Sequence, residues 1–434
     1  MNKLLTSIVA FLSCTFSHAA EVTNAPATGT LDAIFAGGAP WETTEAQFVQ
    51  QNLNAGFRWL STAHDSAQSN RKDLTLFGQP INQAVIQFAK GKISGISILF
   101  YNRGDAGEIL RDPFEAMEAQ CEKAISQIAK TTPTPRGQDP KNAVKASGLI
   151  WKTDISQFLL EYSMTKNGAN FRPEFIRLTV TPAEKQKSLL EQTQAASLTP
   201  IKFSGPAHVK KDPGGDVSID DIPMVDQGAK GYCVVATAER VMRYYGVRVD
   251  EHELAQIANS DASKGTSNEV MILAIEKLCN RLRVKTRTLL EFNGHRFLTL
   301  TLPEYNRAAK KGKRAPEIQT GLHNNLAQLY QQMDSSLLCE VRTKNPAEMD
   351  HFFRLTQKHI DSGIPVLWSV MIGIQPQPND PKGFGGHTRL IIGYNAKTNE
   401  IIYTDSWGIG HEKKRMSLAD AWTMTIAAHT IEPL

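Results

Sequence analysis

The chain has 434 residues, of which 41% are hydrophobic and 21% charged, and this composition is typical of globular domains. It excludes bulk disorder, a collagen-like repeat and a membrane-embedded bundle, and the length allows two or three domains. The formal net charge of +4 comes from 48 basic and 44 acidic residues, a balance that gives no reason to expect nucleic acid as a partner. Five cysteines are too few for a disulfide framework.

The first twenty residues have the pattern of a secretory signal peptide. Lys3 precedes an apolar stretch from Leu4 to Phe16, and small residues follow up to Ala20. The apolar stretch is short for a membrane-spanning helix, so we expect an exported protein, periplasmic or extracellular, without stable membrane insertion after signal removal. An uncleaved N-terminal anchor and lipidation of Cys14 remain open alternatives.

Residues 21–182 are expected to form a separate α+β domain. One segment, Asp112–Ile128, repeats apolar residues at helical spacing, and Asp112 is the expected N-terminal cap. Short apolar runs predict strands at 74–77, 84–88, 93–101, 149–151, 157–163 and 175–180. No nucleophile–base pair, phosphate-binding loop or metal-ligand spacing occurs here, so the role of this domain stays unknown. The polar residues 183–220, with several prolines and glycines, predict an exposed linker.

Residues 221–434 follow a different pattern and are expected to form a second domain. The strongest signal is an amphipathic helix over Cys233–Tyr245, which Gly246 ends. Further helices are expected at 251–258, 269–278, 322–333 and 347–362, and strands at 283–290, 364–372, 388–394 and 400–403. The basic segment 293–321 predicts a solvated loop.

The segment that leads into the Cys233 helix has the features of a thiol nucleophile. A helix N-terminus favours the reactive thiolate through the helix dipole and its free backbone N–H groups, which can also stabilise an oxyanion. Gly228 and Gly231 would let the loop approach a substrate closely. The side-chain amide of Gln227, six residues before the thiol, could donate to the same oxyanion.

A thiol nucleophile needs a base, and the base needs an orienting partner. His387 opens the predicted hairpin of strands 388–394 and 400–403, and Asp405 follows its second strand. Both positions lie at the same end of a hairpin, so we expect Asp405 to bind one imidazole nitrogen and the other to face Cys233. Trp407 is expected to shield that bond from water.

These residues resemble the papain-like cysteine peptidases. The continuation of the Cys233 helix to Tyr244-Tyr245-Gly246, and the block from Gly386 to Gly408, are more similar to the C39-like branch. The resemblance covers about residues 221–422 and does not include the N-terminal region. Lys230 stands where papains carry a cysteine, and Asp405 stands in place of their asparagine.

The resemblance implies a thiol peptidase that hydrolyses a peptide or related amide bond through an acyl-enzyme. Cys233 would be the nucleophile, His387 the general base and acid, Asp405 the orienting group and Gln227 an oxyanion donor. The implied partner is a peptide or protein substrate, with no metal and no cofactor. Transglutaminase-like acyl transfer and a non-catalytic binding module on a peptidase fold are the alternatives, and the oligomeric state stays open.

The other cysteines and histidines give weaker signals. Cys121 and Cys279 fall on apolar helical stripes and are expected to be buried and structural. A disulfide between Cys279 and Cys339 remains open in an oxidising compartment. The remaining histidines show no metal-ligand pattern and are expected at the surface: His295, His323, His351, His359, His411 and His429.

Overall fold

The structure is a computed structural model of the chain. It describes residues 29–36, 40–136, 146–167, 170–183, 203–227, 232–247, 249, 251–258, 268–277, 282–292, 294–313, 315–319, 326–375, 377–378, 380 and 383–434. The expected signal peptide with Cys14, the glycines at 228 and 231, and Cys279 all lie outside these residues. We call residues 29–183 the N-terminal part and residues 203–434 the C-terminal part.

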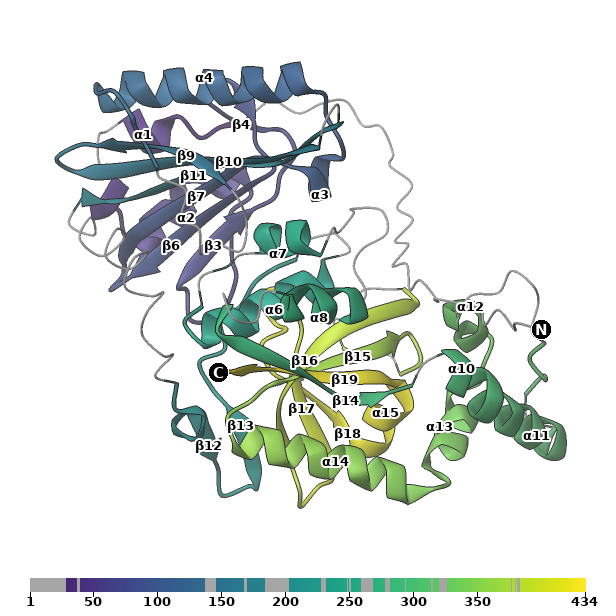
Figure 1. The fold of residues 1–434 in the computed structure, drawn as a ribbon. Helices are drawn as coiled ribbons and strands as arrows, with labels where there is room; N and C mark the ends of the chain where they lie inside the picture. Colours follow the sequence, from purple (N-terminus) through teal and green to yellow (C-terminus); the bar gives the residue numbers. More distant parts are fainter. Residues whose placement is uncertain are drawn as a thin grey trace.

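An eight-stranded antiparallel sheet forms the centre of the N-terminal part (Figure 1). Its strands, in spatial order, are β2 (Arg58–Trp59), β3 (Ser66–Ser69), β6 (Gln83–Ala89), β7 (Lys92–Asn102), β11 (Asn170–Pro182), β10 (Ser156–Asn167), β9 (Ser147–Lys152) and β8 (Thr134–Pro135). A small sheet contains β1 (Gly29–Thr30), β4 (Leu74–Leu76) and β5 (Gln79–Pro80). The helices are α1 (Ala33–Ala36), α2 (Glu45–Gln51), α3 (Arg103–Ala106) and α4 (Arg111–Ala129), with 3-10 turns at Pro40–Glu42 and Leu53–Ala55.

The long helix α4 packs across strands β9, β10 and β11, as Figure 1 shows. Phe114, Cys121 and Ile125 recur at helical spacing and are fully buried against the sheet, as the sequence predicts. The expected cap is wrong, because the helix begins at Arg111 and Leu110 occupies the N-cap position. Asp112 instead lies in the first turn, where a negative charge favours the helix dipole.

The C-terminal part is built on a second antiparallel sheet in the order β12-β13-β16-β15-β19-β14. In addition, β17 pairs with β16, and β18 pairs with β17. Its strands are β12 (Val209–Lys211), β13 (Asp216–Ile219), β14 (Val284–Glu291), β15 (Val366–Ile372), β16 (Gly385–Asn395), β17 (Glu400–Thr404), β18 (Lys414–Ser417) and β19 (Thr425–Pro433). Its helices are α6 (Cys233–Tyr244), α7 (Glu251–Ile257), α8 (Asn268–Glu276), α10 (Gly294–Arg296), α11 (Leu302–Gly312), α12 (Leu326–Gln331), α13 (Ser335–Thr343), α14 (Pro346–Asp361) and α15 (Leu418–Met424). A 3-10 turn, Gly205–His208, precedes β12, and a π-helical segment, Phe297–Thr301, joins α10 to α11.

Helix α6 is the central helix of this part. It packs on β16 and β19, while α14 packs on β13, β15 and β16 (Figure 1). The sequence predicts an amphipathic helix, but the structure buries every residue of α6 from Cys233 to Met242, including Glu239 and Arg240. Surrounding elements enclose α6 from Cys233 to Met242, so Glu239 and Arg240 contact other residues of the protein rather than solvent.

Two predictions for this half differ from the structure. The second half of the expected linker 183–220 contributes β12 and β13, and Ser218 pairs with Gly393 of β16. The basic segment 293–321 is helical over most of its described residues, because Leu302, Tyr305 and Ala309 bury one face of α11. The clustered lysines of this segment lie on the opposite, solvated side of an ordinary amphipathic helix.

The overall mixture of helices and antiparallel sheets agrees with the α+β class expected from the sequence. Buried apolar residues gather in one large cluster within residues 31–180 and another within residues 219–431. A small third cluster, Leu99, Ala146 and Phe175, packs against Ile257 of α7 and so joins the two parts. Among the described residues, no helix combines the length and apolar character needed to cross a bilayer.

Candidate active site

Cys233 is the first residue of α6, and its side chain is 5% exposed. Tyr232 occupies the N-cap position with a non-helical backbone and makes no side-chain capping hydrogen bond. The positive end of the helix dipole therefore acts beside the thiol, as the sequence predicts. This position favours a thiolate over a neutral thiol.

His387 and Asp405 come together at one end of the β16–β17 hairpin. Leu390 pairs with Thr404, so His387 on β16 and Asp405 just after β17 are neighbours. The His387 Nε2–H donates to Asp405 Oδ1 at 2.8 Å, since a carboxylate accepts and cannot donate. The imidazole also hydrogen-bonds the Cys233 thiol. Because Nε2 is engaged, Nδ1 is the ring nitrogen that serves the sulfur.

The electrostatics of the buried pair favour an imidazolium. Burial alone would lower the pKa of His387, but hydrogen bonds with Asp405 and Cys233 outweigh it and raise the pKa to about 9. Burial would raise the pKa of Asp405, but the charge of Arg389 and the hydrogen bond from His387 hold it at about 2. The site therefore has a charged carboxylate and a protonated imidazole beside the thiol near neutral pH.

Arg389 is a further component that the sequence analysis missed. It lies two residues after His387 on β16, fully buried, and its Nε donates to Asp405 Oδ1 at 3.2 Å. Its terminal nitrogen donates to Asp380, and its guanidinium stacks on Tyr403. The feature of the sequence that could have indicated Arg389 is strand periodicity, because residues i and i+2 lie on the same face of a strand and Arg389 therefore shares a face with His387.

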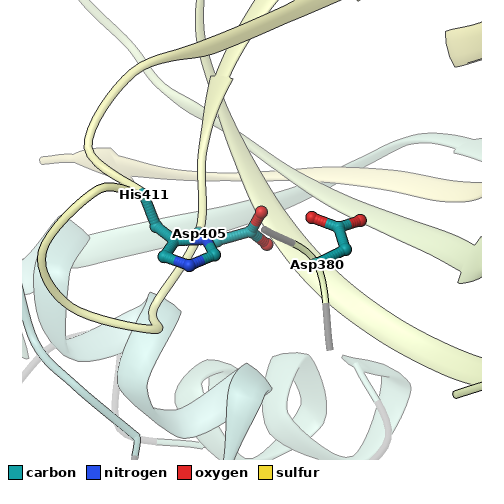
Figure 2. Close-up of side chains that lie close together, drawn as sticks. All are labelled: Asp380, Asp405 and His411. Carbon is teal, nitrogen blue, oxygen red and sulfur yellow. The ribbon is translucent and has the colours of Figure 1, made fainter. Parts of the chain in front are cut away.

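Asp380, Asp405 and His411 offer possible metal-ligand atoms within 4.8 Å of one another (Figure 2). Lys414 Nζ lies 2.8 Å from Asp380 and 3.9 Å from Asp405, and Arg389 pairs with both carboxylates. Two side-chain cations already balance the two carboxylates, so a divalent ion would meet no net negative charge. We interpret this cluster as an ion-pair network around Asp405.

Aromatic and histidine side chains cover the His387–Asp405 bond. The Trp407 ring stacks on His387 with centroids 4.2 Å apart and planes 9° from parallel, as expected for a shield against water. His411 packs edge-on against the same indole. The expectation that His359, His411 and His429 lie at the surface is wrong, because all three are buried in the C-terminal part. Burial, helped by Lys414, lowers the pKa of His411.

Gln227 is buried at 3% exposure, and its backbone N–H donates to Ser406 O at 2.9 Å. This bond places the segment before Cys233 against the segment that follows Asp405.

Arg240, two turns along α6, also joins these two segments. It donates to Pro223 O at 2.9 Å, Asp405 O at 2.9 Å and Thr404 Oγ1 at 2.8 Å. Burial lowers the pKa of Arg240 to about 10. Arg240 was absent from the sequence prediction.

Comparison with known proteins gives two findings. Residues 303–428 match the model of the peptidase C39-like family, a range that contains His387 and Asp405 but not Gln227 and Cys233. Among solved structures, the chain is similar to xylellain, a cysteine protease from Xylella fastidiosa, at 14% identity and a TM-score of 0.28. That alignment covers 55% of this chain and 91% of xylellain. No curated protein sequence matches the chain.

The family match thus falls on the strands and loops that carry His387 and Asp405. The thiol precedes the matched range, and the fold brings it to the imidazole. On these grounds residues 303–428, within the C-terminal part, are similar to the peptidase C39-like family.

Proposed function

We propose that this protein is a cysteine peptidase that hydrolyses a peptide or related amide bond through an acyl-enzyme. The observation that carries the proposal is the imidazole of His387, which hydrogen-bonds both the Cys233 thiol and the Asp405 carboxylate. The match of the region around His387 to a peptidase family supports the same reading.

The proposed reaction starts from a Cys233 thiolate and a His387 imidazolium. The sulfur attacks the substrate carbonyl carbon, and the negative oxygen is stabilised by N–H groups at the start of α6 together with Gln227. The imidazolium gives its proton to the amine as the C–N bond breaks, which leaves a thioester. His387 then takes a proton from water, whose oxygen attacks the thioester and releases the acid and the thiolate. Asp405 holds the Nε2–H of the imidazole throughout.

A second candidate uses the same thioester with a different acceptor. If an amine replaces water, the product is a new amide, as in transglutaminase-like acyl transfer. Asp405 supports this candidate, because papains have asparagine at this position and an aspartate is compatible with both reaction classes. A binding module on a peptidase fold is the non-enzymatic alternative.

The test is hydrolysis of a mixed peptide library by the full chain, followed by mass spectrometry. We expect cleaved peptides from the unmodified protein and none from Cys233→Ala, with Cys339→Ser as the matched control that keeps activity. A primary amine added in excess separates the two acyl-transfer outcomes, since transamidated products would replace the acids. Equal cleavage by Cys233→Ala would overturn the assignment of the nucleophile.

We also propose that the protein is exported. The support is the charged, apolar and small-residue pattern of residues 1–20. Fractionation of a producing bacterium, with N-terminal sequencing of the protein outside the cytoplasm, should give a chain that starts near residue 21. Retention of the full-length chain in the cytoplasm would contradict export.

A further inference from the structure

The N-terminal part contacts the residue that directly precedes the thiol. Tyr232, the N-cap of α6, is fully buried, and Asn102 Nδ2 at the end of β7 donates to its Oη at 3.3 Å. The Oδ1 of Asn102 accepts from the Gly104 N–H at 3.3 Å and caps α3. One asparagine side chain therefore fixes α3 with its oxygen and contacts Tyr232 with its nitrogen.

Gly104 makes this contact sterically tight. A Cβ at position 104 would overlap the hydroxyl group of Tyr232 and the ring carbon that carries it. No side chain fits there unless Tyr232 moves or the two parts separate. Figure 1 shows α3 at the side of the N-terminal sheet that faces the C-terminal part.

Two more contacts from the N-terminal part reach segments that adjoin site residues. Gln68 Nε2 donates to Asp226 O at 3.3 Å, beside Gln227. The Thr62 N–H donates to Glu412 Oε1 at 3.0 Å, and the other oxygen of Glu412 accepts from the Gly410 N–H at 2.7 Å. The three contacts therefore reach the residue before Gln227, the residue before Cys233 and the loop after Asp405.

These contacts are made to supporting residues and not to the reacting atoms. The groups that the N-terminal part contacts are the Tyr232 hydroxyl, the Asp226 carbonyl and the Glu412 carboxylate. With these contacts in place, the Cys233–His387 and His387–Asp405 hydrogen bonds are both formed. A blocking segment would instead have to occupy the thiol or the imidazole. The contacts therefore point to support of the site.

We propose that the N-terminal part positions the nucleophile through Tyr232, which the Asn102–Gly104 turn holds in place so that Cys233 keeps its hydrogen bond to His387. Tyr232 is a positioning residue, since it acts through its neighbour in the chain. The inference rests on the proposed function and assigns a role to the part of the chain that the family match leaves out. Because misplacement of a reacting group by about 1 Å can cost on the order of a hundredfold in rate, small shifts of Tyr232 should be measurable.

The experiment compares the pH dependence of iodoacetamide alkylation of Cys233, measured peptide by peptide, in full-length variants. Gly104→Ala drives a methyl group into Tyr232, and Tyr232→Phe removes the hydroxyl. Tyr244→Phe is the matched control. It removes a tyrosine hydroxyl from the other end of α6, and that hydroxyl donates to Gly363 O within the C-terminal part. Thermal unfolding of each variant reports whether it is folded.

We expect alkylation at pH 7 to fall about tenfold in Gly104→Ala and about threefold in Tyr232→Phe, with the alkylation midpoint moved toward that of an ordinary thiol, about 8.5. Tyr244→Phe should keep the parent profile. An unchanged profile in a folded Gly104→Ala, or faster alkylation, would overturn the inference. If Gly104→Ala does not fold, equal profiles for Tyr232→Phe and Tyr244→Phe overturn it. Failure of the proposed function would give a different result, namely a Cys233 that is not alkylated near neutral pH even in the unmodified protein.

Discussion

At the scale of single residues, Asp405 is the group on which the charge state of the site depends. One of its oxygens accepts from both His387 and Arg389, and Lys414 lies beyond the other. Arg389 lowers the pKa of Asp405 directly, so the carboxylate stays charged in a buried place. A charged carboxylate in turn keeps His387 protonated, which is the state that supports a thiolate.

Asp405→Asn should therefore act through His387. The neutral amide gives the buried imidazolium less support, so the pKa of His387 falls, and we expect alkylation of Cys233 at pH 7 to slow on the order of a hundredfold. Asp420→Asn is the matched control, because Asp420 lies in the first turn of α15 and its carboxylate accepts from the N-cap residue Ser417. Equal rates in the two variants would show that Asp405 does not tune the pair.

The same pKa shifts predict how stability depends on pH. His387 has a raised pKa, so its contribution is fully present below about 6.5 and is lost as the pH rises through about 9. Asp405 has a lowered pKa, so its contribution is present above about 4 and is lost as the pH falls toward about 2. Urea unfolding of the parent and of Asp405→Asn should differ most between pH 4 and 6.5. The difference should shrink as the pH rises through about 9, where the His387 part is lost and the part from Arg389 remains. A constant difference from pH 5 to 9.5 would contradict this linkage.

Sequence reasoning predicted that His387 and Asp405 meet, but it did not predict the arginines around them. Cys233 was found from its place before an apolar helix, and the closeness of His387 and Asp405 from hairpin geometry. Arg389 was missed although it shares a strand face with His387, and Arg240 was missed because nothing in the sequence around it indicates its partners. Those partners, such as Thr404 for Arg240, lie on segments far away in the chain.

At the scale of elements, Arg240 joins α6 to the end of β17 and to the segment before Gln227. Arg240→Met removes three hydrogen bonds and leaves buried acceptors unsatisfied, so the free energy of unfolding should fall by about 3 kcal/mol. Arg243→Met, one turn along, removes one ion pair of a half-exposed guanidinium with Glu239 and should therefore cost less than the loss of three buried hydrogen bonds. Urea denaturation of both variants checks this; equal losses would mean that Arg240 has no special structural role.

The strand β13 belongs to the C-terminal sheet although the sequence predicts a linker there. Gly393 on β16 packs so closely that an added Cβ would lie 2.6 Å from Val217 O and 2.9 Å from Ser218 Cβ. Gly393→Ala should therefore lower the free energy of unfolding by about 1–3 kcal/mol. Gly385→Ala, on the same strand with open space around the added carbon, should leave it unchanged. An unchanged unfolding midpoint in Gly393→Ala would argue against the close pairing of β13 with β16.

Most long elements were predictable because their apolar periodicity is strong, as in α4, α6, α14 and the β16–β17 hairpin. The errors have physical causes. In α11 a run of lysines masked the buried positions Leu302, Tyr305 and Ala309, which still follow helical spacing. The strand β13 is short, and its pairing partner β16 lies far along the chain, so local sequence gave no signal.

At the scale of the whole molecule, the two parts are joined by polar contacts as well as a small apolar cluster. Arg177 of the N-terminal sheet pairs with Glu253 of α7 at 3.3 Å, and Ser163 hydrogen-bonds Gln256 at 3.1 Å. Together with the Asn102–Tyr232 bond, these contacts place the N-terminal part against α7 and the start of α6. Sequence reasoning could not predict this docking, since each contact joins residues that are far apart in the chain and that carry no shared motif.

The most direct test of the central claim is the alkylation rate of Cys233 in the full-length protein, resolved by peptide from pH 5 to 10. Two other cysteines serve as internal references. Cys339 is a half-buried free thiol, and burial raises the pKa of Cys121 to about 12. If His387 and α6 hold a thiolate–imidazolium pair, Cys233 reacts fastest of the three at pH 6 to 7, well below the pKa of about 8.5 of an ordinary thiol. A Cys233 that stays unmodified at neutral pH, or that reacts only above about pH 8.5 as an ordinary thiol does, would contradict the account.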